Sequence, residues 1–261
     1  MKIGVQTYTI RKAQKKSFEH AYLPLIRLGI KAFELSRMKF TKKNADTIHS
    51  LIQQHDIHIV SIQAKPKDVF HHGDELVEFC HRTGCKNVVL SMLPFHCIFG
   101  SEKVFYEFVS ELDSLAEVYQ KHGITLAYHH HDWEYERCSN GKTRMDELIE
   151  KTQKVQFVHD TYWTVRCGYS SVEQIQKFGS RLLGIHLRDL VLYRKGLRIV
   201  MKDGAVGTGI IDFQSILNEA EKVQCSYAVI EQNTKHPYED ITLSFKTCLQ
   251  YAADRKEKHH E

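Results

Sequence analysis

The feature that most constrains the fold of this chain is a regular alternation of short apolar runs with longer amphipathic segments. The runs are rich in β-branched residues, as buried parallel strands are. Between them apolar residues recur at helical spacing, and a glycine often stands where a helix would end. We therefore expect strands at residues 3–9, 31–35, 57–63, 87–92, 124–129, 155–160, 183–187 and 227–231.

About eight strand–helix units in 261 residues is the size of a (β/α)8 barrel. A doubly wound sheet is disfavoured because the first run ends in Gln6-Thr7-Tyr8, without a glycine-rich phosphate loop. The four prolines are dispersed, and no linker interrupts the rhythm. The sequence thus predicts an α/β fold, a single (β/α)8 TIM barrel over residues 1–254, with a charged C-terminal tail at 255–261.

Four apolar runs in the second half of the chain lead into residues of metal-ligand type, namely His129, His131, Glu134, Asp160, His186 and Glu231. Because the carboxyl ends of barrel strands converge on one mouth, we expect these side chains to lie close together. Imidazole and carboxylate without thiolate suit Mn²⁺, Mg²⁺, Co²⁺ or Zn²⁺. Such a metal polarises a carbonyl, and a nearby base can then remove the adjacent hydrogen. The set predicts enediolate chemistry on a sugar, ending in isomerisation, epimerisation or elimination.

Composition limits the compartment and the partners. The formal charge of +4 is small and not gathered into one tract, so we expect no nucleic-acid partner. Seven scattered cysteines without a Cys-x-x-Cys pair favour a reduced, cytoplasmic environment. The first run begins next to Met1, which predicts no signal peptide, and no apolar stretch is long enough for a membrane. We expect a small sugar or polyol as partner and leave a homo-oligomer open.

Six segments, in chain order, resemble the xylose isomerase-like TIM-barrel superfamily, and most closely its sugar phosphate isomerase/epimerase branch with inosose dehydratase-like and 3-keto-sugar-acting members. The resemblance covers nearly the whole chain and is specific for the superfamily but not for one substrate. The segments are Ile3-Gly4-Val5-Gln6-Thr7-Tyr8, Tyr128-His129-His130-His131-Asp132-Trp133-Glu134-Tyr135, Asp160-Thr161-Tyr162-Trp163, Gly184-Ile185-His186-Leu187-Arg188-Asp189, Gly207-Thr208-Gly209-Ile210-Ile211-Asp212 and Ile230-Glu231-Gln232-Asn233.

This resemblance implies one divalent metal ion, with Mn²⁺ favoured, held at the ends of strands five to eight. Relatives resembling tagatose epimerase carry a glutamate on strand five where this chain has Tyr128. Glu134 is therefore our predicted first ligand, with His129 or His131 as alternatives. The other three ligand positions match Asp160, His186 and Glu231.

The predicted catalytic residues are Glu231 with Glu134 or His131, and the predicted substrate-binding residues are His129, Trp163, Arg188 and Glu34. Arg188 replaces the lysine of the family's His-x-Lys-Asp, so it can bind an oxygen but cannot be a general base. Trp163, Arg188 and Glu34 could equally form contacts at the barrel rim. We expect His159 to face away from the metal, since adjacent strand residues face opposite sides. The basic stretch 188–202 is expected to be a solvated loop, which could instead guide an anionic substrate.

The main hypothesis is a divalent-metal-dependent isomerase or epimerase acting on a keto- or aldo-sugar or a sugar phosphate. The alternative is a metal-dependent lyase or dehydratase on an inosose or a 3-keto-glycoside. An endonuclease IV-like phosphodiesterase is less favoured, because the ends of the second to fourth runs lack the histidines that a three-metal cluster needs. A non-catalytic sugar-binding barrel is disfavoured by the complete potential ligand set.

Overall fold

The computed structural model describes the backbone of residues 1–258 and the side chains of residues 1–253. Eight parallel strands form a closed barrel, which is completed by the pairing of β10 with β1. The fold predicted from the sequence is confirmed, and every predicted run contains a strand. The barrel strands are β1 (Lys2–Gln6), β2 (Ala32–Leu35), β3 (His58–Ala64), β4 (Asn87–Leu90), β5 (Thr125–His129), β6 (Gln156–Asp160), β7 (Leu182–Leu187) and β10 (Tyr227–Ile230).

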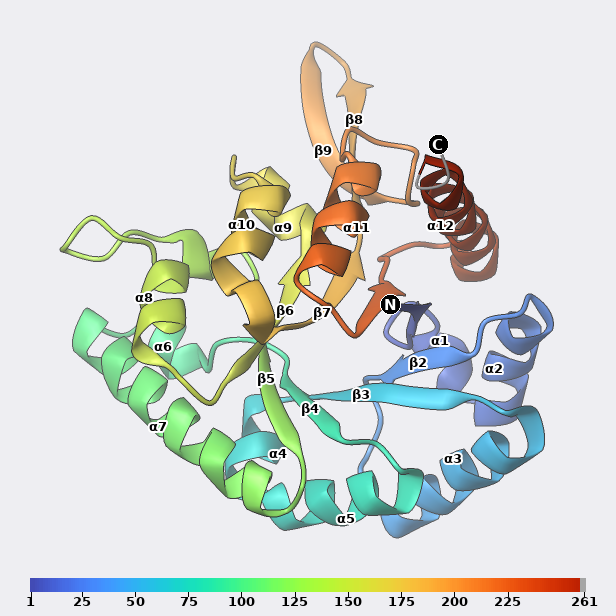
Figure 1. The fold of residues 1–261 in the computed structure, drawn as a ribbon, viewed down its shortest axis with the longest axis horizontal. Coiled ribbons are helices and arrows are strands. Elements are labelled where there is room, and N and C mark those ends of the chain that lie inside the picture. Colours follow the sequence, from blue (N-terminus) through green and yellow to red (C-terminus); the bar gives the residue numbers. More distant parts are fainter. Residues whose placement is uncertain (259–261) are drawn as a thin grey trace.

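Helices surround the barrel as a ring (Figure 1). Their apolar faces pack on the strands; in α7, for example, Phe105, Phe108 and Leu112 are buried. Asp212 caps the N-terminus of α11, accepting a hydrogen bond from the Ser215 backbone N–H at 3.0 Å. The helices are α1 (Arg11–Gln14), α2 (Phe18–Arg27), α3 (Lys42–His55), α4 (Pro66–His71), α5 (Gly73–Thr83), α6 (Phe95–Ile98), α7 (Glu102–Lys121), α8 (Arg144–Lys151), α9 (Thr161–Arg166), α10 (Ser171–Phe178), α11 (Phe213–Lys222) and α12 (Pro237–Lys258), with 3₁₀ turns at Trp133–Tyr135 and Gly179–Arg181.

Two apolar layers hold this arrangement together. The larger layer lies between the strands and the helices. The smaller one is contributed by residues of the barrel strands, among them Ala127, Val158 and Val229. We call this smaller layer the apolar plug. Side chains two residues apart on a strand share a face, so the residue two positions after each of these three lies above the plug. These residues are His129, Asp160 and Glu231.

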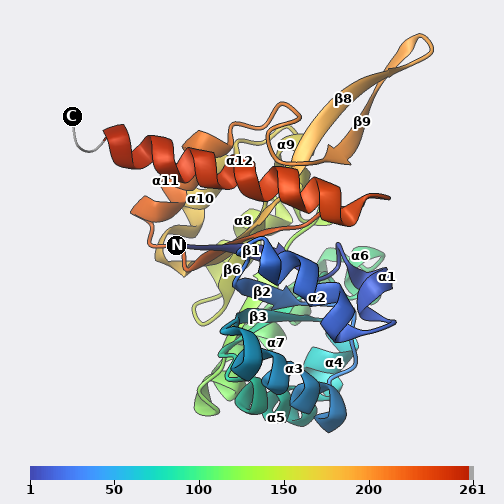
Figure 2. The same ribbon diagram turned by 90° about the vertical axis from the view of Figure 1, so that its right-hand side faces the viewer.

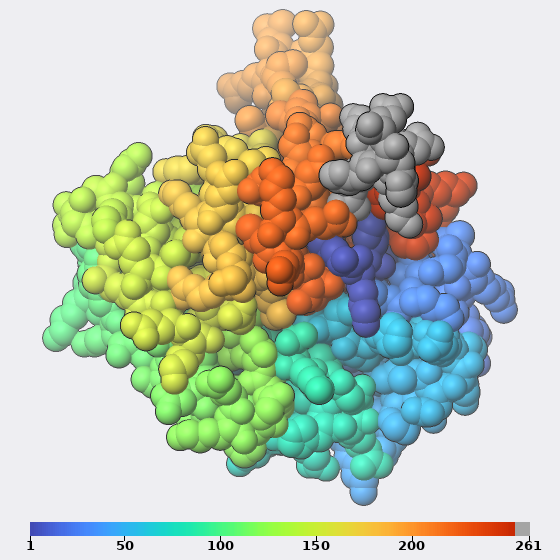
Figure 3. Space-filling view, in the orientation of Figure 1, coloured from blue at the N-terminus to red at the C-terminus, as the bar shows by residue number. Residues whose placement is uncertain are grey.

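The stretch between β7 and α11 corrects the sequence prediction. Instead of a solvated loop, residues 189–204 form an antiparallel hairpin of β8 (Asp189–Lys195) and β9 (Arg198–Gly204). Gly196, with φ of 64°, opens the two-residue turn that joins them. The hairpin projects from the barrel in Figure 2, and in Figure 3 it stands clear of the remaining surface.

The last helix runs into the segment predicted as a charged tail. The backbone of α12 continues to Lys258, so the charged segment expected from residue 255 begins within a helix. Residues 259–261 of that predicted tail lie outside the described residues. None of the described helices combines the length and the apolar character needed to cross a membrane.

Candidate metal centre

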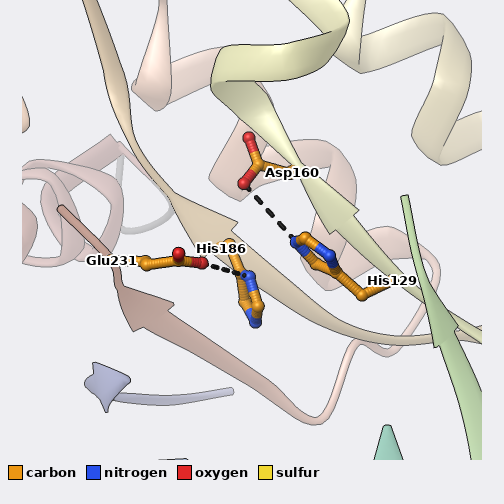
Figure 4. A group of neighbouring side chains, drawn as sticks. All are labelled: His129, Asp160, His186 and Glu231. Carbon is orange, nitrogen blue, oxygen red and sulfur yellow. Dashed lines mark ion pairs between the residues drawn. The ribbon is translucent and has the colours of Figure 1, made fainter. Parts of the chain in front are cut away.

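Four buried side chains from consecutive barrel strands converge at the carboxyl ends of the strands (Figure 4). One potential ligand atom of each lies within 4.8 Å of all the others. The parallel register explains part of this convergence, because Asp160 pairs directly with His186. The four residues are His129 at the end of β5, Asp160 at the end of β6, His186 in β7 and Glu231 directly after β10.

The two histidines of this group are oriented by hydrogen bonds to their far ring nitrogens. In His186, Nε2 lies 2.7 Å from Glu34 Oε1, while Nδ1 lies 2.8 Å from Glu231 Oε2. In His129, Nδ1 lies 3.2 Å from the Ser91 carbonyl oxygen, while Nε2 lies 3.5 Å from Asp160 Oδ2. A ring nitrogen must carry a proton to donate to an oxygen, so a neutral ring directs its other lone pair into the group. This is the arrangement of metal-ligating histidines.

Unpaired polar atoms test whether a cation fits here. Among the described residues, His129 Nε2, His186 Nδ1 and Glu231 Oε2 are buried and form no well-aligned hydrogen bond, although the last two lie 2.8 Å apart as an ion pair. Leaving such atoms unpaired is costly, and in native proteins it calls for an explanation such as an ion. A divalent cation would bind all three lone pairs at once. The residues present therefore fit a metal with two nitrogen and two carboxylate ligands.

The electrostatics of the group also favour a bound cation. Burial alone would lower the pKa of His186, but the carboxylates of Glu34 and Glu231 raise it to about 10. Burial likewise opposes ionisation of Glu231, yet Arg188 and His186 lower the pKa of that carboxyl to about 2. The site thus stabilises a positive charge between carboxylates, a proton in one state or a metal ion in another.

Glu34, predicted to bind substrate, has protein partners for both of its carboxylate oxygens. Its side chain is fully buried at the end of β2, and both oxygens are occupied. Oε1 faces His186, while Oε2 accepts hydrogen bonds from Ser61 Oγ and, at 3.0 Å, from the Tyr227 hydroxyl. Tyr227 reaches it because residue 184 is glycine, whose added Cβ would lie 2.3 Å from the tyrosine ring. Glu34 therefore positions His186 from behind.

Glu134, predicted as a metal ligand and as a base, lies outside the group of four converging residues. It lies in the 3₁₀ turn after β5, and Tyr128 donates a hydrogen bond to its Oε1. Oε2 accepts the His131 backbone N–H at 2.7 Å. Burial raises the pKa of this carboxyl. The pair formed by Tyr128 and Glu134 fixes the turn that presents His131, and His129 is the residue of this segment that joins the converging group.

His131 and Trp163 do face the open side of the group. Both line the cleft at the barrel mouth, with ring centroids 5.4 Å apart. Nδ1 of His131 has no hydrogen-bond partner among the described residues, and burial lowers its pKa to about 3. His159 faces away, as predicted: its Nδ1 lies 3.2 Å from His130 Nε2 in the layer behind the barrel wall.

Arg188 joins the metal group to the hairpin. Its Nη1 lies 3.3 Å from Asp160 Oδ2 and 3.7 Å from Glu231 Oε1. On its other side, Nη2 donates at 2.7 Å to Asp203, which lies in β9. Sequence reasoning did not find Asp203, because the hairpin that brings it back to the mouth was not predicted. Arg188 therefore forms rim ion pairs while still lining the cleft.

The cleft above the group has a volume of about 1250 Å³. Its lining includes His129, His131, Trp163, Arg188 and Glu231 on the side of the metal group. The remaining lining comes largely from the segments that follow β1 to β4, including Phe40, Lys65 and Phe95. Only one group of metal-ligand residues occurs among the described residues, so the three-metal arrangement of an endonuclease IV-like enzyme has no support there.

Comparisons with known proteins agree with this architecture. The family model described as "Xylose isomerase-like TIM barrel" matches residues 25–248. A search of curated protein sequences gave no match. Solved structures below a quarter identity show the same fold and nothing finer. Three of them are a sugar phosphate isomerase/epimerase from Parabacteroides distasonis (16% identity, TM-score 0.74, covering 93% of this chain and 91% of that one), the IOLI protein with a bound zinc atom (17%, 0.72, 97% and 99%) and the "probable 3-DHS dehydratase AsbF" from Bacillus anthracis (13%, 0.72, 95% and 99%).

Proposed function

This chain belongs to the xylose isomerase-like TIM-barrel family, and we propose that it is a divalent-metal-dependent isomerase or epimerase acting on a keto- or aldo-sugar. The observation that carries the proposal is the buried group of two histidines and two carboxylates whose unpaired atoms face one space at the barrel mouth. Fold alone would not support an activity, since many functions share this barrel. The ligand chemistry of the site supports it.

We propose that His129, Asp160, His186 and Glu231 hold the metal, with Mn²⁺ favoured and Zn²⁺ as the second choice. When bound, the metal would act as a Lewis acid that polarises a substrate carbonyl. Arg188 holds the Asp160 and Glu231 carboxylates in place through its ion pairs. The apolar plug beneath these side chains excludes water from the inner side of the group.

Proton transfer is assigned to Glu231 and His131, which both line the cleft. Because burial lowers the pKa of His131 to about 3, the ring is neutral at pH 7 and can accept a proton at Nδ1. Glu231 offers a carboxylate that lines the same cleft. One of the two would remove the hydrogen next to the carbonyl, and return of the proton at the other carbon or face would give isomerisation or epimerisation.

Elimination is the second candidate, and the size of the cleft favours it. At about 1250 Å³ the cleft is larger than the roughly 300–1000 Å³ typical of small-molecule sites. It has room for a leaving group beyond the reacting sugar, as in an inosose or a 3-keto-glycoside substrate. Both candidates share the first proton removal and differ in how the enediolate collapses.

The experiment measures deuterium uptake from solvent at the carbon next to the carbonyl, over a panel of keto-sugars, with Mn²⁺-loaded protein. We expect exchange that stops after EDTA treatment while the circular dichroism spectrum stays that of a folded barrel. The large apolar core, unlike that of a small zinc domain, does not depend on the metal. Turnover without exchange and without metal dependence would falsify the proposal. Identifying the product in the same deuterium experiment distinguishes elimination, which releases a leaving group, from epimerisation.

A further inference from the structure

The cleft has a second, cationic side that takes no part in the metal group. Arg37 follows β2, Lys65 follows β3 and Lys67 lies in α4, and all three line the same cleft as Glu231. Their side chains are exposed. Among the described residues none of the three forms an ion pair, although other lysines and arginines of the chain do. Positive charge is thus available at the mouth.

Arg37 is held toward this side by a fixed backbone. It is one of few residues other than glycine with positive φ, at 56°. The preceding residue is bonded on both sides: the Ser36 N–H donates to Thr7 Oγ1 at 2.8 Å, and its carbonyl accepts from Gln14 Nε2, also at 2.8 Å. The Arg37 guanidinium lies 5.2 Å from the centre of the Tyr8 ring. Sparsely populated backbone conformations persist where surroundings enforce them, often at ligand sites.

The balance of charge in the cleft selects the sign of the ligand. Leaving out side chains that form ion pairs, the lining contains four cations (Arg37, Lys65, Lys67 and Lys202) and two carboxylates (Asp68 and Glu111). A cleft lined by an excess of one charge raises the local concentration of the opposite charge. Arginine and lysine are also the side chains that bind carboxylate and phosphate oxygens best.

We propose that Arg37 and Lys65 bind an anionic substituent of the substrate, a carboxylate or a phosphate, on the β2–β3 side of the cleft. The inference rests on the proposed function, since it places the reacting carbonyl at the metal group on the opposite side. Both sets of residues line one continuous cleft, so a single elongated molecule can contact both. The enzyme would then discriminate against uncharged sugars of the same ring.

Three probes that share one sugar ring test this inference: D-glucose, D-glucuronate and D-glucose 6-phosphate. Binding to Mn²⁺-loaded protein is followed by tryptophan fluorescence, because Trp163 lines the cleft and Trp133 lies beside His131. We expect both anions to bind more tightly than glucose, with affinities that fall as salt rises. The stronger of the two anions distinguishes a carboxylate from a phosphate site.

Two variants locate the binding. Arg37→Asn removes the charge while keeping a residue that tolerates positive φ, and Lys65→Gln removes a charge from an exposed side chain. Each should weaken anion binding about tenfold, as expected for loss of a hydrogen bond to a charged group, and leave glucose binding unchanged. Lys39→Gln is the matched control, since Lys39 is exposed and close in sequence but does not line the cleft.

No preference for the anions, or an equal loss in Lys39→Gln, would overturn the inference. Calorimetric titration with Mn²⁺ keeps the two proposals separate. If the metal binds and keto-sugars exchange deuterium, but anions are not preferred and neither Arg37→Asn nor Lys65→Gln weakens their binding, the proposed function stands without the anion site. If the anion preference depends on Arg37 and Lys65 but no metal binds, the anion site stands and the proposed function fails.

Discussion

The two sides of the barrel mouth are built in opposite ways. Where β5, β6, β7 and β10 end, His129 and His186 are buried and each is oriented from behind by an oxygen acceptor. Where β2 and β3 end, Arg37 and Lys65 are exposed and form no ion pair among the described residues. A centre that binds a small ion needs its ligands fixed beforehand, whereas a surface that attracts a charged substituent can stay solvated. The two proposals therefore place the reaction and the selection of substrate charge on different strands.

The largest effect should come from Asp160→Asn on the buried side. This change removes a proposed ligand and leaves the Arg188 and His129 side chains facing a neutral amide. We expect no bound Mn²⁺ in metal analysis and no measurable deuterium exchange. Asp132→Asn is the control. Asp132 comes shortly after β5, the strand that ends in His129, but it pairs with Arg166 at 3.1 Å and lies outside the group. Full activity in Asp160→Asn would contradict the assigned metal centre.

His131→Asn should come next. The variant keeps a polar side chain at the cleft but removes the ring nitrogen assigned to proton transfer. General acid–base groups contribute about 10²- to 10⁴-fold, so we expect a loss of exchange rate in that range with Mn²⁺ affinity retained. Steady-state rates and calorimetry on the same preparation measure both. An unchanged rate would assign the proton transfer to Glu231 alone.

Glu34→Gln and Glu134→Gln form a matched pair of buried glutamates. Glu34 orients His186, so its change should weaken Mn²⁺ binding about 10- to 100-fold. Glu134 accepts hydrogen bonds from Tyr128 in β5 and from the turn after it, so its change should leave Mn²⁺ affinity intact and lower stability by about 1–3 kcal/mol. Calorimetry and urea unfolding separate the two effects. The reverse pattern would restore Glu134 as a ligand.

The smallest effect concerns acid stability behind the buried side. Burial lowers the pKa of His159 to about 3, against about 6.5 in an unfolded chain. Between these two pKa values the unfolded state binds more protons than the folded state. The free energy of unfolding therefore decreases as the pH falls below about 6.5. At pH 5 the loss is about 2 kcal/mol.

His159→Asn keeps a donor near His130 but does not titrate. We expect the difference between urea midpoints at pH 7 and pH 5 to shrink in this variant. In His20→Asn, where the histidine is exposed, it should stay unchanged. An equal pH dependence in wild type and His159→Asn would mean that other groups govern acid unfolding.

The barrel could be predicted from sequence because buried parallel strands are apolar throughout and therefore stand out as runs. The hairpin could not. Its exposed strands carry Arg194, Lys195 and Arg198, and such basic residues are typical of loops. Each strand of the hairpin is short, so its residue pattern gives too weak a strand signal to outweigh the basic composition.

Part of the site could be predicted in the same way, because Asp160, His186 and Glu231 mark the ends of apolar runs. The position of Glu134 depends on a hydrogen bond from Tyr128, a tertiary contact that spacing does not reveal. A signal for His129 did exist: it follows Ala127 by two residues, just as Asp160 follows Val158. Applying the two-residue periodicity of strands to the fifth run would have favoured His129 over Glu134 as the first ligand.

Gly184 makes the site vulnerable at a distance. It has no ionisable group and lies within β7, yet the space it leaves holds the ring of Tyr227, whose hydroxyl supports Glu34. A single added methyl group would displace that ring, release Glu34 and leave His186 free to turn. A change as conservative as glycine to alanine would then abolish activity in a protein whose proposed ligands are all intact. A variant screen restricted to polar residues of the mouth would overlook this position.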